Sequence, residues 1–155
     1  MVKVLFISSV GGHLEQLLNL KKVISKYHSY IVTEKNPSTL SLEEEYENVY
    51  YLPFFSRKDL FKSLFLYLKI ITISLKLYFK IKPNVIVTTG AGGVLPMCII
   101  GKLAGCKVIY IETFSRNNSK TMTGSLCYHF ADVFIIQWEQ LREFYPKAVF
   151  LGSIY

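Results

Sequence analysis

Hydrophobic residues occur in short runs that alternate with longer segments, in which leucine, isoleucine and phenylalanine recur every three or four positions. The short runs are typical of buried strands and the longer periodic segments of helices. Strands are predicted at Lys3–Ser8, Ser29–Thr33, Val49–Leu52, Asn84–Thr88, Lys107–Ile111, Val133–Ile136 and Ala148–Leu151. Helices are predicted between them, at Gly12–Lys26, Asp59–Lys80, Val94–Ala104, Thr123–Phe130 and Glu139–Phe144.

Several strand segments are continuous runs of aliphatic residues, such as VIVTT and KVIYI. Such runs are typical of strands that are covered on both faces, as in a parallel sheet. The regular alternation of strand and helix predicts a doubly wound, Rossmann-like α/β fold with a mostly parallel sheet of about seven strands. No internal repeat or low-complexity linker interrupts residues 1–155, so one domain is expected. The stretch EKNPSTLSLEEEYE is predicted to be a mobile loop.

Two of the predicted strands end in glycines. The first is followed by Gly11 and Gly12, and the fourth by Gly90, Gly92 and Gly93. Glycines there let the backbone approach a ligand, and free N–H groups at a helix start attract anions. If the first and fourth strands are neighbours, both loops flank the topological switch point, where open α/β sheets bind ligands.

A dinucleotide such as NAD is disfavoured at this crevice. The first loop lacks the G-x-G-x-x-G fingerprint, and no acidic residue is predicted to end the second strand in the ribose-binding manner.

Two polar side chains follow predicted strands at the same edge of the sheet. His13 comes directly after the first glycine pair, where it can contact a ligand or transfer a proton, or merely cap the helix. Glu112 ends the fifth strand, and either faces the crevice or serves as a helix cap or ion-pair partner of Arg116.

The net charge of +7 suits an anionic partner, whether phosphate groups, nucleic acid or an acidic bilayer. Nucleic acid is the weakest of these, because the lysines lie among aliphatic residues without a stacking platform of aromatic residues and arginines. The three cysteines, Cys98, Cys106 and Cys127, have no CxxC spacing and apolar neighbours. They predict buried, reduced thiols in a cytoplasmic protein rather than a metal site. The first apolar run is too short for a signal peptide.

The segment DLFKSLFLYLKIITISLKLYFKIK is hydrophobic, but lysines interrupt it too often for a membrane span. These lysines are spaced by four or seven, and therefore form one narrow helical stripe: Lys58, Lys62, Lys69, Lys76 and Lys80. The apolar arc beside them is wider than one packed face requires. We expect the helix to lie against an anionic membrane; the alternative is a core helix with one solvated face.

Five motifs resemble those of the acceptor-binding subunit of two-component glycosyltransferases: SSVGGHLEQL, TTGAGGVLP, IETFSR, TGSLCYHFADVFIIQW and YPKAVFLGSIY. That group includes the membrane-anchored subunit of the enzyme that adds the second N-acetylglucosamine to dolichol-diphosphate, and bacterial relatives in capsule and exopolysaccharide synthesis. A more distant likeness is to the N-terminal half of the GT-B enzyme that makes lipid II. The eukaryotic subunits carry an N-terminal transmembrane anchor, whereas here the first strand begins at once, so the lysine-striped helix is expected to attach the chain peripherally to the cytoplasmic face of the cell membrane.

The resemblance implies that this chain binds a lipid-diphosphate-linked sugar, while a separate small subunit binds the nucleotide sugar, a UDP-sugar. It implies an inverting transfer without metal or cofactor, in which His13 or Glu112, or else a group on the partner, takes the proton from the acceptor hydroxyl. The diphosphate would be bound by Gly11, Gly12, Gly90, Gly92, Gly93, Ser115 and Arg116. The main rival is a non-catalytic scaffold that only recruits the catalytic subunit to the membrane.

The C-terminal segment Gly152–Tyr155 follows the last predicted strand and carries two large apolar residues, Ile154 and Tyr155. We expect them to insert into a groove on the donor-binding subunit, with Gly152 letting the chain leave the sheet edge. The alternative is that they fold back onto their own domain.

Overall fold

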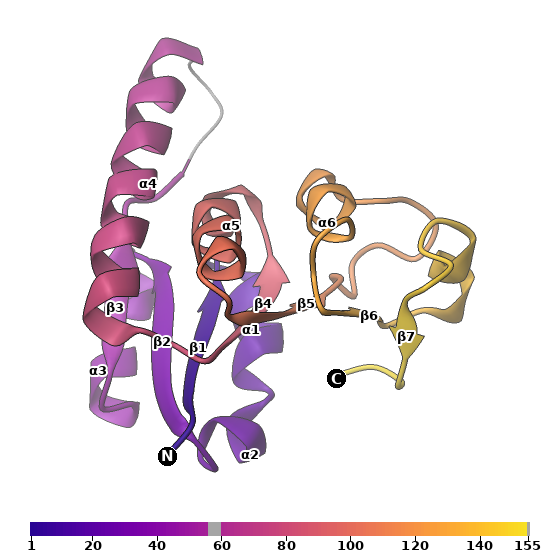
Figure 1. Cartoon of the computed structure of the whole chain (residues 1–155), viewed down its shortest axis with the longest axis horizontal. Helices are drawn as coiled ribbons and strands as arrows, with labels where there is room; N and C mark the ends of the chain where they lie inside the picture. The colour runs from indigo at the N-terminus through magenta and orange to yellow at the C-terminus, as the bar shows by residue number, and fades with distance from the viewer. Residues whose placement is uncertain (56–59, 155) are drawn as a thin grey trace.

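The computed structural model describes residues 1–55 and 60–154. Within them seven parallel strands form one sheet, in the order β3-β2-β1-β4-β5-β6-β7 (Figure 1). The strands are β1 (Lys3–Ser8), β2 (His28–Glu34), β3 (Val49–Leu52), β4 (Val85–Gly90), β5 (Lys107–Ile111), β6 (Val133–Ile136) and β7 (Val149–Phe150). The predicted doubly wound parallel sheet is therefore confirmed.

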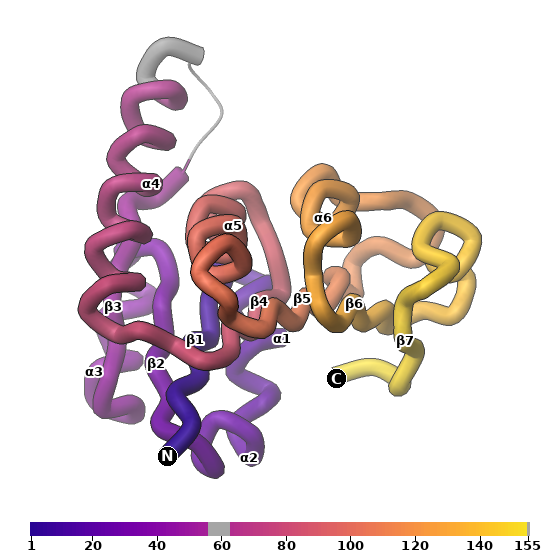
Figure 2. Tube along the Cα trace, in the orientation of Figure 1, coloured from indigo at the N-terminus to yellow at the C-terminus, as the bar shows by residue number. Residues whose placement is uncertain are grey.

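Helices connect the strands and cover both faces of the sheet. The α-helices are α1 (Gly12–Leu18), α2 (Lys21–Ile24), α3 (Leu42–Glu45), α4 (Leu60–Ile81), α5 (Leu95–Leu103) and α6 (Met122–Cys127). Short 3₁₀ helices are η1 (Pro37–Thr39), η2 (Gly92–Val94) and η3 (Glu139–Glu143). Helices α4 and α5 pack against each other, and the N-terminal part of α4 projects beyond the sheet (Figure 2).

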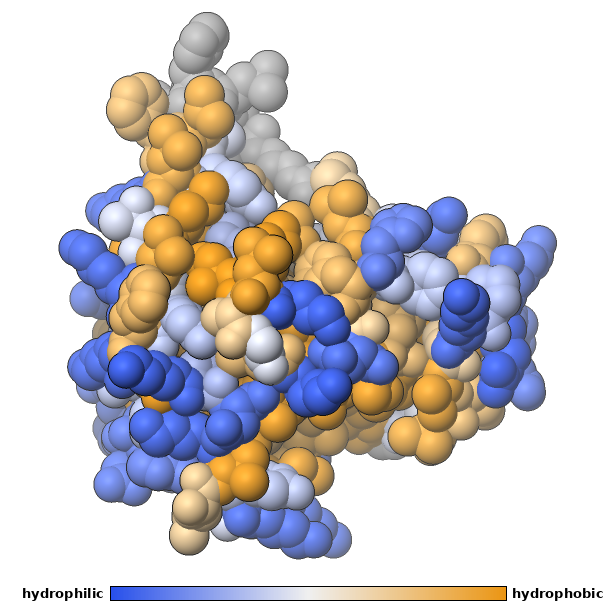
Figure 3. Space-filling view, in the orientation of Figure 1, coloured by the Kyte–Doolittle hydropathy of each residue, from blue (hydrophilic) through white to orange (hydrophobic). Residues whose placement is uncertain are grey.

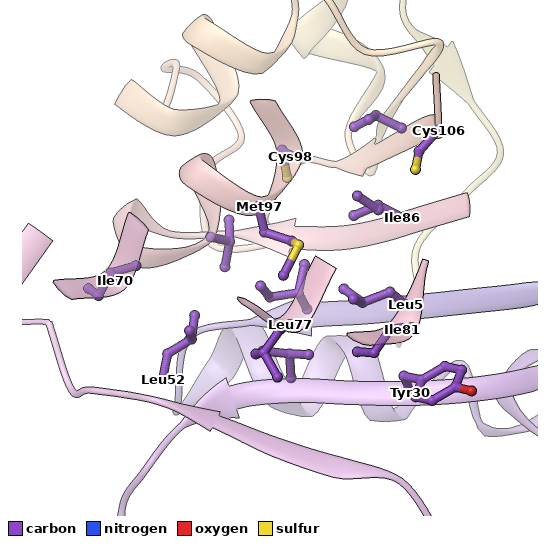
Figure 4. Close-up of a cluster of buried hydrophobic side chains, with 14 residues drawn as sticks. Leu5, Tyr30, Leu52, Ile70, Leu77, Ile81, Ile86, Met97, Cys98 and Cys106 are labelled. Atoms are coloured by element: carbon purple, nitrogen blue, oxygen red, sulfur yellow. The ribbon is translucent and has the colours of Figure 1, made fainter. Parts of the chain in front are cut away.

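The alternation of side chains along β1 separates two hydrophobic clusters. Leu5 and Ile7 pack with residues of α4 and α5 on one face of the sheet (Figure 4). Val4 and Phe6 point to the opposite face, where they join Leu17 of α1 and other buried residues. Because successive side chains of a strand point to opposite faces, a sheet buried on both sides needs the continuous apolar runs seen in the sequence.

Helix boundaries differ from the predicted ones where local geometry decides. The predicted helix Gly12–Lys26 is interrupted after α1, because the backbone at Leu20 leaves helical geometry with ψ 19°. Leu17 and Ile24, on either side of this bend, are both buried in the same cluster. The predicted helix Glu139–Phe144 is a 3₁₀ helix.

The segment predicted as a mobile loop instead contains η1 and α3. Asn36 caps η1, because its side chain accepts the backbone N–H of Ser38 and its own N–H donates to Thr39 Oγ1. Thr39 is fully buried and donates to the carbonyl of Glu34. These local hydrogen bonds order a segment whose composition is typical of loops.

Asp132 joins the start of β5 to the end of α5. Its carboxylate accepts the N–H of Val108 at 2.9 Å and lies 2.9 Å from Lys102 Nζ and 3.3 Å from Lys107 Nζ. The N–H of Val108, followed by the two lysines, lowers the pKa of Asp132 from 3.8 to about 2.

A carboxylate whose pKa is lower in the folded state stabilises the fold above its ordinary pKa and loses that effect as the pH falls. Asp132→Asn should remove this pH dependence. Between about pH 5 and pH 2, we expect the unfolding free energy of the wild type to fall by about 1 kcal/mol more than that of Asp132→Asn, since water screens this partly exposed group. Urea unfolding at several pH values measures the difference; parallel pH profiles would contradict the role given to Asp132.

Candidate functional site

The switch point of the sheet lies between β1 and β4, which pair in parallel as expected. Their register shifts between Ile7 and Ser8, so that Ser8 pairs with Gly90 and Thr89 is left out of the regular pairing. A bulge of this kind releases backbone groups from the ladder and re-aims them. The freed carbonyl of Thr89 is used by the turn that follows β1.

His13 lies at the start of α1 and is tied to Thr89 through two hydrogen bonds. Its Nδ1 is 2.7 Å from the carbonyl oxygen of Thr89, whose Oγ1 donates to the His13 carbonyl at 2.6 Å. Because a carbonyl oxygen only accepts, Nδ1 is the donor in this contact, and the tautomer that donates from Nδ1 has its lone pair on Nε2. The N-cap of α1 is Gly11 and receives no side-chain cap, so His13 does not serve as the helix cap.

The two glycine loops contain backbone conformations that side chains rarely adopt. Gly11 has φ 78° and Gly90 has φ 96°, and a Cβ on Gly90 would clash with the hydroxyl of Tyr110. Ala91 holds φ 81° although it has a side chain. Strained backbone is concentrated at functional sites, where the surrounding structure holds it in place.

Strand β2 extends one residue further than predicted and ends at the acidic residue Glu34. Its carboxylate is buried and faces inward. One oxygen accepts the N–H of Val10 at 3.3 Å and the other the N–H of Phe55 at 3.1 Å. Glu34 thus fixes the turn after β1 to the segment after β3.

Glu112 ends β5 and is fully buried. Its carboxyl group accepts the N–H of Thr113 at 2.9 Å, the hydroxyl of Tyr145 at 2.8 Å, and the hydroxyl of Thr121. Burial, followed by the charge of Glu112, raises the pKa of Tyr145 well above its usual range. Thr121 in turn caps α6 by accepting the N–H of Gly124. Glu112 therefore contacts the start of α6 rather than Arg116, which donates to Ser119.

Gln16 connects the turn after β1 to the segment after β5, and the sequence pattern did not predict this role. Its side-chain amide donates to the carbonyl of Gly12 and to Thr113 Oγ1, and accepts the N–H of Phe114 and the amide of Gln137. All of its hydrogen-bonding capacity is used, and it is 1% exposed. A polar residue on a short amphipathic helix gives no sequence signal that distinguishes this role from a surface position.

A small pocket of about 250 Å³ opens at this junction and is lined by Gly12, Gln16, Phe114 and Ser115. Phe114 packs on Trp138 at a ring separation of 4.6 Å, and Trp138 Nε1 donates to the Phe114 carbonyl. Ser115 is exposed, as is Arg116 beside it.

The C-terminal segment folds back onto its own chain as far as it is described. The N–H of Ile154 donates to Gln137 Oε1 at 2.9 Å, and its side chain packs against the cluster that contains Leu17. For Ile154 this is the second of the two expected arrangements, in which the segment folds back onto its own domain. Gln137 stabilises it by providing a buried hydrogen-bond acceptor. Tyr155 lies outside the described residues.

Helix α4 has a buried side and an exposed apolar side. Its buried residues are Ile70, Ser74, Leu77 and Ile81. Intervals of three and four residues place them on one face. The exposed apolar residues are Leu64, Phe65, Leu68, Leu75 and Phe79, and Figure 3 shows apolar side chains running along this helix. No helix among the described residues is long and apolar enough to cross a membrane.

The lysines of this helix differ in their surroundings. Lys69 and Lys76 are exposed, whereas the ammonium of Lys80 lies 4.7 Å from the ring of Tyr50, over its face. Lys58 lies outside the described residues, and only the backbone of Lys62 is described. A groove of about 410 Å³ adjoins the N-terminal half of α4, with a lining that includes Phe55, Tyr67, Gly92, Leu95 and Leu126.

The three cysteines are buried and unpaired, as predicted. A hydrogen bond with Cys127 and burial raise the pKa of the Cys98 thiol. In the part of the chain that the structure describes, no group of three histidine, cysteine, aspartate or glutamate residues could hold a metal ion.

Solved structures share this fold. MurG of Acinetobacter baumannii aligns with a TM-score of 0.71 and 16% identity, over 90% of this chain and 43% of that chain. UDP-N-acetylglucosamine 2-epimerase from Rickettsia bellii aligns with a TM-score of 0.72 and 17% identity, over 99% of this chain and 45% of that one. The chain thus spans less than half of each and has the Rossmann-like fold predicted for the N-terminal half of a GT-B enzyme.

Curated relatives align over nearly the whole chain. The UDP-N-acetylglucosamine transferase subunit ALG14 of Rattus norvegicus is 28% identical over 176 residues, covering 97% of this chain and 82% of the rat protein. The Homo sapiens protein of the same name is 26% identical over 179 residues, covering 99% of this chain and 83% of the human protein. The family described as "Oligosaccharide biosynthesis protein Alg14 like" matches residues 3–154, and the chain therefore belongs to this family.

Proposed function

We propose that this chain is the acceptor-binding, membrane-associated subunit of a heteromeric, inverting glycosyltransferase. A separate small subunit binds the nucleotide sugar, and the acceptor is a saccharide linked to a lipid diphosphate. The rat and human relatives are named UDP-N-acetylglucosamine transferase subunits, which supports UDP-N-acetylglucosamine as the donor. Neither they nor the family description supports the capsule or exopolysaccharide setting implied by the sequence resemblance, and we do not propose it.

The observation that carries the catalytic part of this proposal is the orientation of His13 at the switch point. With Nδ1–H donated to Thr89, the basic Nε2 takes the proton from the acceptor hydroxyl. That oxygen attacks the anomeric carbon of the donor sugar as the nucleoside diphosphate leaves, which inverts the anomeric configuration. General base catalysis of this kind contributes roughly 10²–10⁴ to the rate.

Glu112 is assigned a positioning role in this scheme. Its carboxyl oxygens already accept hydrogen bonds from Thr113, Thr121 and Tyr145, and the residue is fully buried. It holds the segment after β5 against α6. The acceptor diphosphate is bound by Gly11 and by the second glycine loop (Gly90, Gly92 and Gly93), together with Arg116.

The outward face of α4 is assigned to the membrane. Exposed apolar residues on this scale mark an interaction surface, and the exposed lysines beside them suit anionic headgroups. Met122 and Leu126 of α6 are also exposed, and they line the groove that adjoins α4. We therefore place the chain peripherally at the cytoplasmic face of the cell membrane, with the lipid of the acceptor near that groove.

His13 is tested with a pair of variants that separate its base function from its contact with Thr89. His13→Ala loses both, whereas His13→Asn keeps a donor near the position of Nδ1 but has no base. We expect both to lower kcat for sugar transfer at least tenfold in the reconstituted two-subunit complex, with partner binding unchanged.

Glu112→Gln is the companion variant and should lower stability while leaving kcat within tenfold of the wild type. If His13→Asn has wild-type activity, His13 acts only by holding the β4 bulge through its hydrogen bonds with Thr89, and it is not the base. If the His13 variants and Glu112→Gln are all active, the base belongs to the partner subunit.

Membrane attachment is tested by reversing charge on one side of α4. Changing Lys62, Lys69 and Lys76 to glutamate should release the chain from anionic vesicles at ordinary salt, because each lysine near such a surface contributes about 1 kcal/mol. A matched control changes the exposed Lys22, Lys26 and Lys35 to glutamate, which alters net charge equally. Equal loss of vesicle sedimentation in both triple variants would show that net charge alone, and not α4, governs binding.

The C-terminal segment is tested by deleting Ser153–Tyr155. We expect the truncated chain to lose co-purification with the donor-binding subunit, for which Gly152, Ile154 and Tyr155 are the proposed contacts. The isolated chain should stay folded and lose about 1–3 kcal/mol of unfolding free energy, because the hydrogen bond to Gln137 and the packing of Ile154 are both removed. Ile154→Ala keeps that hydrogen bond and removes only the apolar side chain. Unchanged partner affinity in the truncated chain would exclude this segment as the contact.

A further inference from the structure

We propose that the pocket lined by Gly12, Gln16, Phe114 and Ser115 binds one pyranose ring of the acceptor. This inference rests on the proposed function and specifies which part of the acceptor this end of the crevice recognises. The pocket lies between the turn after β1 and the segment after β5, and His13 directly follows its first residue.

The walls of the pocket are fixed by hydrogen bonds that no ligand has to supply. Gln16 donates to the Gly12 carbonyl at 3.1 Å and accepts the N–H of Phe114 at 2.9 Å, so one side chain spaces the two walls. Phe114 is held from the other side by Trp138, which bonds its carbonyl and packs on its ring. A site preorganised in this way loses little conformational entropy when a ligand binds.

The chemistry of the lining suits a sugar ring better than a phosphate group. It combines the half-buried residue Phe114, whose ring can pack against the C–H face of a pyranose, with the exposed residue Ser115, whose Oγ lies 3.0 Å from Thr113 Oγ1. No charged side chain lines the pocket among the described residues. Its volume of about 250 Å³ lies below the roughly 300–1,000 Å³ typical of sites for drug-sized ligands, and suits a single ring.

Gly12 supports a ligand role because the fold itself does not need glycine there. A Cβ at this position would meet no atom within 4 Å, and its backbone lies outside the positive-φ region that favours glycine. Gly11 and Gly90, by contrast, both have positive φ. The missing side chain at Gly12 therefore leaves space in the pocket rather than permitting a turn.

The full chain contains a built-in reporter for this pocket. Trp138 is its only tryptophan and packs directly on Phe114, so ligand contact with Phe114 should change the intrinsic fluorescence. Titration with N-acetylglucosamine should give a saturable change in the wild type. In Gly12→Ala the apparent affinity should fall at least tenfold, while the melting temperature is unchanged or higher, since alanine favours the first turn of α1.

Two control variants test whether the fluorescence change arises at this pocket. Phe114→Leu keeps apolar volume but removes the ring, and should also weaken binding at least tenfold; Leu103→Ala, at an exposed position on α5, should not. Absence of a saturable change with the sugar in the wild type would overturn the proposal. A fluorescence change with inorganic diphosphate that Gly12→Ala weakens to the same extent would also overturn the proposal, because the pocket would then be an anion site.

Transfer kinetics in the reconstituted complex separate this inference from the proposed function. Gly12→Ala should raise the KM for the lipid-linked acceptor at least tenfold and leave the KM for the nucleotide sugar unchanged. A variant complex with the wild-type acceptor KM would overturn the pocket assignment but not the transferase function. A wild-type complex without transfer would overturn the proposed function, whereas the fluorescence titration would still report on the pocket.

Discussion

The candidate site depends on the parallel pairing of β1 with β4 at the centre of the sheet. From this pair the chain winds to β2 and β3 on one side and to β5, β6 and β7 on the other. The turns that follow the two central strands therefore diverge and leave a crevice at their carboxyl ends. The bulge at Thr89 adds chemistry to this geometry, because the released carbonyl orients the His13 ring. Without this pairing, the glycine loops would not lie together.

A chain of buried polar side chains makes the geometry of the crevice specific. Gln16 and Gln137 are 1% and 2% exposed and bond to each other, and Gln137 also bonds the carbonyl of Glu112. An amide buried without partners would cost stability, so a network of this kind favours the one arrangement in which every group is paired. The same network reaches the C-terminal segment through Ile154. The walls of the crevice and the proposed partner contact are thus held by one set of hydrogen bonds.

The sheet could be predicted from the sequence because aliphatic runs and the glycines after them reflect burial and turns, which are local properties. The site could be predicted only as far as residues next to those glycines, such as His13. Gln16 was missed because its role depends on partners 97 and 98 positions away. Glu34 was missed because β2 ends one residue beyond the predicted boundary. The segment after it was predicted as a mobile loop, whereas the Asn36 cap orders it. Gln16 and Glu34 are polar groups whose hydrogen-bonding partners become their neighbours only in the folded chain, whereas the Asn36 cap uses residues two and three positions away.

Helix α4 shows that burial alone does not explain the composition of this chain. One face, with Ile70, Leu77 and Ile81, is enough to pack the helix against the sheet and α5. Phe65 and Phe79 are 80% and 66% exposed on the opposite side, where they add nothing to the core. Large apolar residues that are exposed together in this way are typical of an interaction surface. The fold therefore presents the polar crevice at the carboxyl ends of the strands and an apolar helix on one face of the sheet. Together these two surfaces suit an acceptor with a polar head and a lipid tail.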